Sequence, residues 1–138
     1  MRFDNLQAWL SWQEQLHPNP IDLGLERVKR VLEALKLTFP PYRIITVGGT
    51  NGKGSSVAFA EAILRAGGYR VGAYTSPHIL RYNERIRVEG TEVSDQELCD
   101  SFARIDTARG EVSLTYFEFG LDRKSVVLGN SVELGGRR

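Results

Sequence analysis

A glycine-rich segment between two apolar stretches constrains this chain more than any other feature. Residues 46–55 read Thr-Val-Gly-Gly-Thr-Asn-Gly-Lys-Gly-Ser, after a β-branched run and before an amphipathic segment. Glycines let the main chain bend so that several N–H groups point inward, and a following helix directs the positive end of its dipole toward the same point. Lys53 adds a full positive charge there. The segment therefore predicts a site for the phosphates of a nucleotide.

The segment departs from the common phosphate-loop spacing. That pattern places a glycine five residues before the Gly that precedes the lysine, and a serine or threonine directly after the lysine. Here those positions hold Val47 and Gly54. A metal ion bound with the nucleotide would therefore take its protein oxygen from elsewhere, and the nearby hydroxyl groups belong to Ser55, Ser56, Thr75 and Ser76. A glycine-rich turn without a ligand is the alternative interpretation.

The residues around the loop predict a unit of strand, loop, helix and strand over 43–74. Apolar spacing indicates helices over 5–16, 22–35, 57–66 and 94–109, and strands over 43–47, 70–74 and 85–89. Asp22 and a capping box of Ser94 and Glu97 are predicted helix starts, and Gly67-Gly68 is a predicted helix end. The unit predicts two parallel strands, 43–47 and 70–74, joined by a right-handed crossover. Because ligands gather at the carboxyl ends of parallel strands, residues 75–78 are expected to face the same crevice as Lys53.

Composition excludes several classes of protein. The chain has 138 residues, of which 41% are hydrophobic and 25% charged, as in ordinary globular proteins. The net charge of +1, without a dense basic run, argues against a nucleic-acid surface. The single Cys99 cannot form an internal disulfide, which indicates a reducing compartment. No signal peptide and no apolar run of roughly 18 residues is visible, so we expect a cytoplasmic protein without a membrane partner.

Five ordered blocks carry a family resemblance. The blocks are residues 21–27, 49–55, 74–78, 83–88 and 114–120, and the match as a whole extends over residues 3–120. Together they resemble the folylpolyglutamate synthase/dihydrofolate synthase family, a branch of the Mur ligase group, and its bifunctional bacterial members most. The resemblance implies an α/β fold. It also implies that residues 1–120 are the N-terminal part of a parallel-sheet P-loop ATPase domain of Mur ligase type, here truncated.

The resemblance implies an ATP-dependent ligase. Members of this family phosphorylate the carboxylate of dihydropteroate or folate with ATP and Mg²⁺, and the amine of L-glutamate then displaces phosphate. The implied partners are these small molecules, and the parent enzyme is expected to be a monomer. By motif, Lys53 is the catalytic residue and Ser76 binds the metal. The implied nucleotide-binding residues are Thr50, Asn51, Gly52, Lys53, Gly54 and Ser55.

The resemblance also implies residues that contact the pterin-bearing substrate. They are Gln15, Leu16, His17, His78, Thr115, Tyr116, Phe117 and Glu118. From the residues alone, His17 before Pro18 is equally a helix-end residue, and His78 is equally a partner for a loop carbonyl. An aromatic pair beside Glu118 can stack on a pterin ring, but aromatic side chains are as often part of a core.

The match ends at Gly120, and the remaining segment 121–138 is expected to be a foreign or disordered tail. A chain that lacks the later family blocks is expected to be inactive as a ligase by itself. Two other functions stay open at this point. One is a Mur ligase that acts on a UDP-muramyl peptide, and the other is an inert, truncated nucleotide-binding domain.

Overall fold

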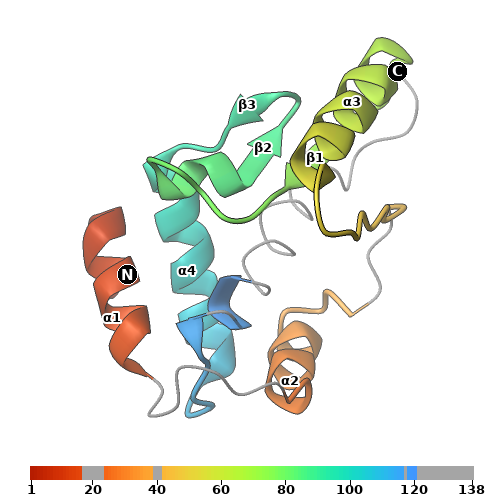
Figure 1. Ribbon diagram of the computed structural model, residues 1–138. Coiled ribbons are helices and arrows are strands. Elements are labelled where there is room, and N and C mark those ends of the chain that lie inside the picture. Colours follow the sequence, from red (N-terminus) through yellow and green to blue (C-terminus); the bar gives the residue numbers. More distant parts are fainter. Residues whose placement is uncertain (17–23, 39–41, 117, 121–138) are drawn as a thin grey trace. The chain divides into compact units, whose positions relative to one another are not determined.

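The computed structural model describes residues 1–16, 24–38, 42–116 and 118–120. Its elements follow the order α1 (Leu6–Leu16), α2 (Glu26–Ala34), α3 (Lys53–Ala66), β1 (Gly72–Tyr74), a 3₁₀ helix (Tyr82–Arg85), β2 (Ile86–Val88), β3 (Thr91–Glu92) and α4 (Asp95–Arg109) (Figure 1). The described residues fall into two compact units. We call the unit formed within 1–40 and 94–120 the helical unit, and the unit formed by 42–93 the sheet unit.

The helical unit is built on a core of aromatic side chains. Helices α1 and α2 both pack against α4. Trp9, Phe102 and Phe119 are fully buried. The ring centroids of Trp9 and Phe102 lie 5.8 Å apart, and those of Phe102 and Phe119 lie 6.3 Å apart. The indole N–H of Trp9 donates a 3.0 Å hydrogen bond to the carbonyl of Phe3, so this large apolar ring is buried without an unpaired donor.

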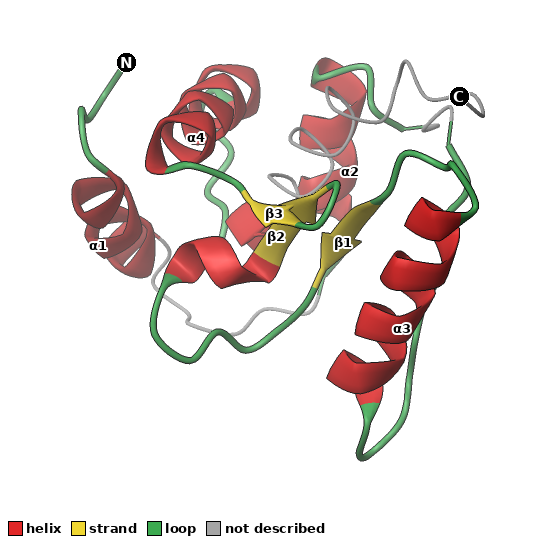
Figure 2. Ribbon diagram, turned by 90° about the horizontal axis from the view of Figure 1, so that it is seen from above, coloured by secondary structure: helices red, strands yellow, loops and turns green. Residues whose placement is uncertain are grey.

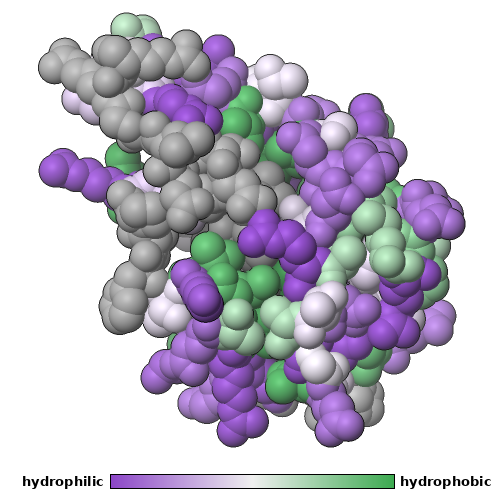
Figure 3. All heavy atoms as spheres, turned by 180° about the vertical axis from the view of Figure 1, so that it is seen from behind, coloured by the Kyte–Doolittle hydropathy of each residue, from purple (hydrophilic) through white to green (hydrophobic). Residues whose placement is uncertain are grey.

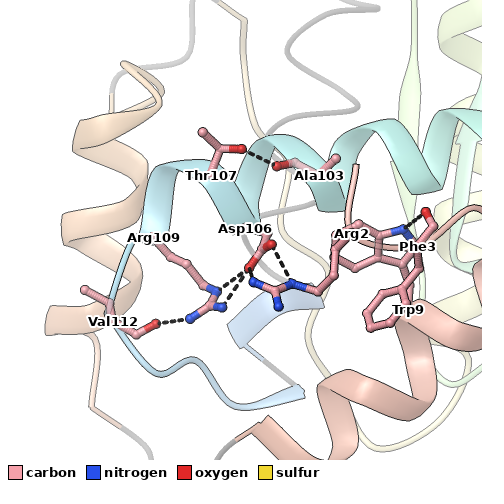
Figure 4. Close-up of polar contacts among 8 residues, drawn as sticks. All are labelled: Arg2, Phe3, Trp9, Ala103, Asp106, Thr107, Arg109 and Val112. Carbon is pink, nitrogen blue, oxygen red and sulfur yellow. Dashed lines mark hydrogen bonds and ion pairs between the residues drawn. The ribbon is translucent and has the colours of Figure 1, made fainter.

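Charged groups close one side of this core (Figure 4). The Asp106 carboxylate accepts hydrogen bonds from Arg2 Nε at 2.9 Å and from Arg109 Nη2 at 2.7 Å. Both guanidinium groups also lie over the ring of Trp12, at 4.8 Å for Arg2 and 5.2 Å for Arg109. The N-terminal segment is thereby attached to the last turns of α4.

The helix starts and stops confirm several predictions from the sequence. Ser94 caps α4, since its Oγ accepts the N–H of Glu97 at 3.2 Å while Glu97 Oε2 accepts the N–H of Ser94 at 2.7 Å. Helix α3 ends at Gly67 as expected. Helix α2 begins later than predicted, with Leu25 as its first boundary residue and no side-chain cap. Asp22, the predicted cap, lies outside the described residues.

The sheet unit contains three short strands in the order β1-β2-β3, and every pair is antiparallel (Figure 2). Gly72 pairs with Val88, and Tyr74 pairs with Ile86. Helix α3 packs on β1. An ion pair holds the helix to the hairpin, because Arg87 Nη2 donates to the buried Glu61 carboxylate at 2.7 Å.

The predicted strand at 43–47 is absent from the described part of the chain, where this segment is irregular. The parallel pairing of 43–47 with 70–74 is therefore not present, and β1 pairs with β2 instead. The reason is physical. A buried parallel strand needs hydrogen-bonded neighbours and apolar cover on both faces, whereas Ile44 is 64% and Ile45 67% exposed.

Other apolar side chains of the sheet unit are also open to the surface. Phe59 and Ile63 of α3 are 71% and 69% exposed. Figure 3 shows one face of the molecule, on which hydrophobic side chains lie at the surface between hydrophilic ones. None of the described helices has the length and apolar composition needed to cross a membrane.

Candidate nucleotide site

The glycine-rich loop leads directly into α3. Gly49 and Gly52 adopt positive φ angles of 145° and 75°, which L-residues with a side chain rarely adopt. Gly52 is the N-cap of α3, and it has no side chain to satisfy the first N–H groups of the helix. The loop thus turns sharply and leaves the N-terminal amides of α3 without a side-chain cap. This is the local geometry that the glycines predict.

Lys53 folds back over the loop that precedes it. Its Nζ donates to the carbonyl oxygen of Gly49 at 2.7 Å and to that of Thr50 at 3.1 Å. Ser56 Oγ donates to the carbonyl of Gly52 at 3.0 Å. These bonds hold the turn closed on its carbonyl side and place the ammonium group beside the helix start.

The loop fits a phosphate group. The first turn of α3 contains no acidic side chain that would repel an anion. A Cβ placed on Gly52 or Gly54 would meet no atom within 4 Å, so space is open along the loop. The predicted nucleotide-binding residues are all exposed and lie in the loop or at the start of α3, namely Thr50, Asn51, Gly52, Lys53, Gly54 and Ser55. Exposed N–H groups, a helix N-terminus and one ammonium group are the donors that a phosphate needs.

Ser76, the predicted metal ligand, follows β1. Chain reversal after α3 makes β1 run back along the helix, toward the end at which Lys53 lies (Figure 2). Ser76 is exposed, and its peptide bond to Pro77 is cis. The hydroxyl of the neighbouring Thr75 donates to the carbonyl of Glu84 at 3.5 Å. In the described residues, no three His, Cys, Asp or Glu side chains cluster as a metal site.

His78 is half-buried two residues further on. Arg85 Nε donates to His78 Nδ1 at 2.8 Å, and the ring of Tyr82 meets the imidazole edge-on, with the centroids 5.6 Å apart. The turn before this cluster is held by Glu84, whose carboxylate accepts the N–H groups of residues 79–81 at 2.7–2.8 Å. These backbone hydrogen bonds lower the pKa of Glu84 below its usual range.

The predicted substrate residues of the helical unit have mixed surroundings. Gln15 is exposed, while Leu16 is half-buried and its carbonyl accepts Ser113 Oγ at 3.2 Å. Tyr116 is half-buried. His17 and Phe117 lie outside the described residues. These positions belong to the helical unit, whereas the glycine-rich loop belongs to the sheet unit. The structure therefore describes the predicted substrate residues and the predicted nucleotide residues as two separate sets.

Thr115 and Glu118 are buried and bonded to each other. Thr115 Oγ1 accepts the N–H of Glu118 at 3.2 Å, and Glu118 Oε2 accepts the N–H of Thr115 at 2.8 Å. The Glu118 carboxylate also pairs with Arg27 Nη2 at 3.0 Å. Sequence reasoning missed this link to α2. The Thr-x-x-Glu spacing is a capping-box signal, which could have predicted the bonds between Thr115 and Glu118 but not the ion pair with Arg27.

Two arginines near this turn, Arg85 and Arg87, differ in their partners. Arg87 is bonded to Glu61, and it therefore serves the packing of α3 on the hairpin. Arg85 contacts His78 and lies 5.3 Å from the ring centroid of Tyr82. Both arginines belong to the predicted strand 85–89, and the sequence alone does not distinguish them.

The chain is similar in sequence to two bacterial synthases. The chain is 52% identical over 115 residues to dihydrofolate synthase/folylpolyglutamate synthase of Escherichia coli (strain K12), covering 83% of this chain and 27% of that protein. It is 54% identical over 114 residues to the protein of the same name from Haemophilus influenzae, covering 83% and 26%. The chain is homologous to these synthases. The resemblance predicted from the sequence is confirmed.

Solved structures agree with this homology. An E. coli FolC structure in complex with DHPP and ADP superposes with a TM-score of 0.88 at 47% identity, over 92% of this chain and 31% of that one. The bifunctional synthase of Yersinia pestis, complexed with AMPPNP and Mn ion, gives 0.86 at 53% identity, over 92% and 31%. The chain thus has an α/β fold like that of these synthases. No family model matches the chain. It spans about a quarter of the length of the curated relatives it matches.

Proposed function

We propose that this chain carries the ATP-binding part of an ATP-dependent carboxylate–amine ligase, which joins L-glutamate to dihydropteroate or folate through an acyl phosphate. One observation carries the proposal. An uncapped helix start, two glycines with positive φ and the Lys53 ammonium lie together, in a chain homologous to synthases whose structures hold ADP or AMPPNP. A carboxylate is a poor acyl donor, and phosphorylation gives it a better leaving group.

The residues of the loop have defined tasks in this proposal. The N–H groups at the start of α3 bind phosphate oxygens, and Lys53 exchanges its carbonyl partners for them. The carbonyls of Gly49 and Thr50 hold the ammonium near the helix start beforehand, so that little reorganisation is needed. Ser76 would hold Mg²⁺, which neutralises charge on the phosphates when bound.

The substrate-binding proposal assigns different tasks to buried and exposed residues of the helical unit. Gln15 and Tyr116 have accessible side chains and are proposed to contact the pterin-bearing substrate, together with Leu16, His17 and Phe117. Thr115 and Glu118 are proposed to hold that surface in shape, because their polar atoms already bond to each other and to Arg27.

The proposal extends to the sheet, the domain and the parent enzyme. Segment 43–47 is proposed to be a strand of a parallel sheet in the complete enzyme, where its exposed Ile44 and Ile45 would be covered. Residues 1–120 are proposed to be one part of the ATPase domain, and 121–138, which lies outside the described residues, a tail unrelated to it. The parent enzyme is proposed to be a cytoplasmic monomer that acts on small molecules.

A chimaera tests the proposed activity. Residues 1–120 would replace the matching part of the E. coli relative, and extension of dihydropteroate would be measured with ATP and L-glutamate. We expect turnover that Lys53→Ala abolishes and that Lys29→Ala, an exposed lysine of α2, leaves unchanged. Turnover with a UDP-muramyl peptide instead, or turnover that survives Lys53→Ala, would contradict the proposal. The 138-residue chain alone is expected to show no turnover.

A further inference from the structure

The turn that follows β1 contains an arginine–histidine pair with an unusual bonding pattern. Arg85 Nε donates to His78 Nδ1 at 2.8 Å. The Arg85 guanidinium also lies 5.3 Å from the ring centroid of Tyr82, which holds it on the aromatic face. Both side chains are half-buried. The two groups are therefore fixed relative to each other by a hydrogen bond and by a shared aromatic neighbour.

This hydrogen bond determines which imidazole nitrogen carries hydrogen. Arginine stays protonated in proteins and has donors but no acceptor. His78 Nδ1 must therefore be the acceptor, and the hydrogen of the neutral ring must lie on Nε2. Within the described residues, Nε2 has no hydrogen-bond partner. The pair thus presents an N–H donor whose position is set by Arg85.

The charge of Arg85 is not balanced by a carboxylate in the described part of the chain. The neighbouring Glu84 interacts electrostatically with His78, but its oxygens already accept the N–H groups of residues 79–81. By contrast, Arg87 on the adjoining strand has Glu61 as its partner. A half-buried guanidinium without a counterion, joined to an oriented N–H donor, is an arrangement suited to an anion.

The pair lies in the segment that follows β1. His78 lies two residues beyond Ser76, in the segment that follows β1, and β1 runs back along α3 toward the end at which Lys53 lies. We propose that His78 Nε2–H donates to an oxyanion and that Arg85 is the positioning residue, which fixes the imidazole through Nδ1 and adds positive charge nearby; we call the two residues the donor pair. The ligand group is a carboxylate or a phosphoryl group. The identity of that ligand rests on the proposed function, whereas the donor pair does not.

The first test looks for the hydrogen bond itself. The ¹⁵N-labelled 138-residue chain would carry His17→Gln, which leaves His78 as the single histidine of the two in the sequence. At mildly alkaline pH we expect a correlation through the hydrogen bond between Arg85 Nε and His78 Nδ1. It should vanish in Arg85→Met and persist in Arg104→Met, a matched change at an exposed arginine of α4. Absence of the correlation in the parent chain would overturn the proposal.

The second test asks whether the pair binds an anion and which one. Inorganic phosphate and 4-aminobenzoate, the aryl carboxylate end of dihydropteroate, would be titrated separately while the His78 Nε2 resonance is followed. We expect a saturable shift with at least one of them, lost in Arg85→Met and retained in the matched control Arg104→Met. The probe that gives the larger shift identifies the group. No shift with either probe, or a shift indifferent to Arg85→Met, would refute the donor pair.

One further variant and one further set of resonances separate the possible causes of a negative result. Arg85→Lys retains a charge and a donor, and we expect it to restore part of the anion response that Arg85→Met removes. If neither variant differs from the parent, Arg85 is not the positioning residue. The amides of residues 50–55 would be followed with ATP and Mg²⁺ in the same samples. If the loop amides shift with ATP and Mg²⁺ but His78 does not shift with either anion, only the donor pair is contradicted. If His78 shifts with an anion but the loop amides do not shift with ATP and Mg²⁺, only the proposed nucleotide site is contradicted.

Discussion

The helical unit and the sheet unit bury their apolar side chains to very different extents. Trp9 and Phe102 in the helical unit are fully buried, whereas Phe59 and Ile63 on α3 of the sheet unit are 71% and 69% exposed. The helical unit thus completes an aromatic core with its own helices. In the described part of the chain, the helix that carries the phosphate loop has an apolar face without cover. The nucleotide site predicted from the sequence therefore lies on the unit whose apolar side chains are less completely buried.

The largest expected effect comes from truncating one phenylalanine in each unit. We expect Phe102→Ala to lower the free energy of unfolding by about 3–5 kcal/mol, because it removes a fully buried ring and leaves a cavity. The same truncation at Phe59 should change it by no more than about 0.5 kcal/mol, since that ring is already in water. Urea unfolding followed by circular dichroism measures both. Equal losses would mean that the α3 face is covered in solution.

Two matched ion pairs sharpen the comparison. Each unit has one buried glutamate joined to a partly exposed arginine, Glu118 with Arg27 and Glu61 with Arg87. Glu118 also accepts the N–H of Thr115, whereas Glu61 Oε1 has no partner among the described residues. We expect Glu118→Gln to cost about 1.5–3 kcal/mol of stability.

The Glu61→Gln change should cost less, because fewer hydrogen bonds to that carboxylate are lost. Amide hydrogen exchange along α4 and along α3 reports the two units separately. A larger loss of protection in α3 with Glu61→Gln than in α4 with Glu118→Gln would reverse the expected order.

The core of the helical unit has one defect, which provides a stabilising substitution. Gln13 is buried, and both polar atoms of its side chain lack a hydrogen-bond partner in the described residues. A buried unpaired amide is unfavourable by roughly 1–3 kcal/mol. We therefore expect Gln13→Leu to raise the unfolding free energy by about 1 kcal/mol. Gln15→Leu, on the exposed side of the same helix, should not. A loss of stability with Gln13→Leu would show that the amide has a partner in solution.

The smallest expected effect concerns pH in the sheet unit. Hydrogen bonds from residues 79–81 lower the pKa of Glu84, so the carboxylate is bound more strongly than the acid. Its contribution to the turn is complete above the usual carboxyl pKa. It is lost as the pH falls through the lowered pKa of the folded chain. The amide resonances of Ile79 and Leu80 should follow this titration, and Glu84→Gln should abolish it. Resonances that titrate at the usual carboxyl pKa would contradict the assignment.

Local signals in the sequence predicted local structure well. The Ser94 capping box, the stop at Gly67 and the glycine turn before Lys53 each depend on neighbouring residues, and the structure has all of them. The strand predicted at 43–47 is not formed in the described residues, because its apolar run indicates burial but not a partner. A strand exists only where another strand bonds to it, and that information lies elsewhere in the chain.

In the candidate site too, features set by neighbouring residues were predictable, whereas contacts between distant residues were not. The glycine turn before Lys53 could be predicted from neighbouring residues alone, whereas the nucleotide-binding roles of residues 50–55 come from the family resemblance and stay predictions. The links between Arg27 and Glu118 and between His78 and Arg85 could not be predicted. The first joins residues 91 positions apart, and the second depends on a turn shaped by Glu84. The functions of Gln15 and Tyr116 came from family resemblance, and they remain predictions.

Isothermal titration of the 138-residue chain with ATP and Mg²⁺ tests the central claim most directly. The uncapped start of α3 and Lys53 should give saturable binding, which Lys53→Ala abolishes and Lys29→Ala preserves. Absence of binding in the parent chain, or equal binding after Lys53→Ala, would contradict a nucleotide site at this loop.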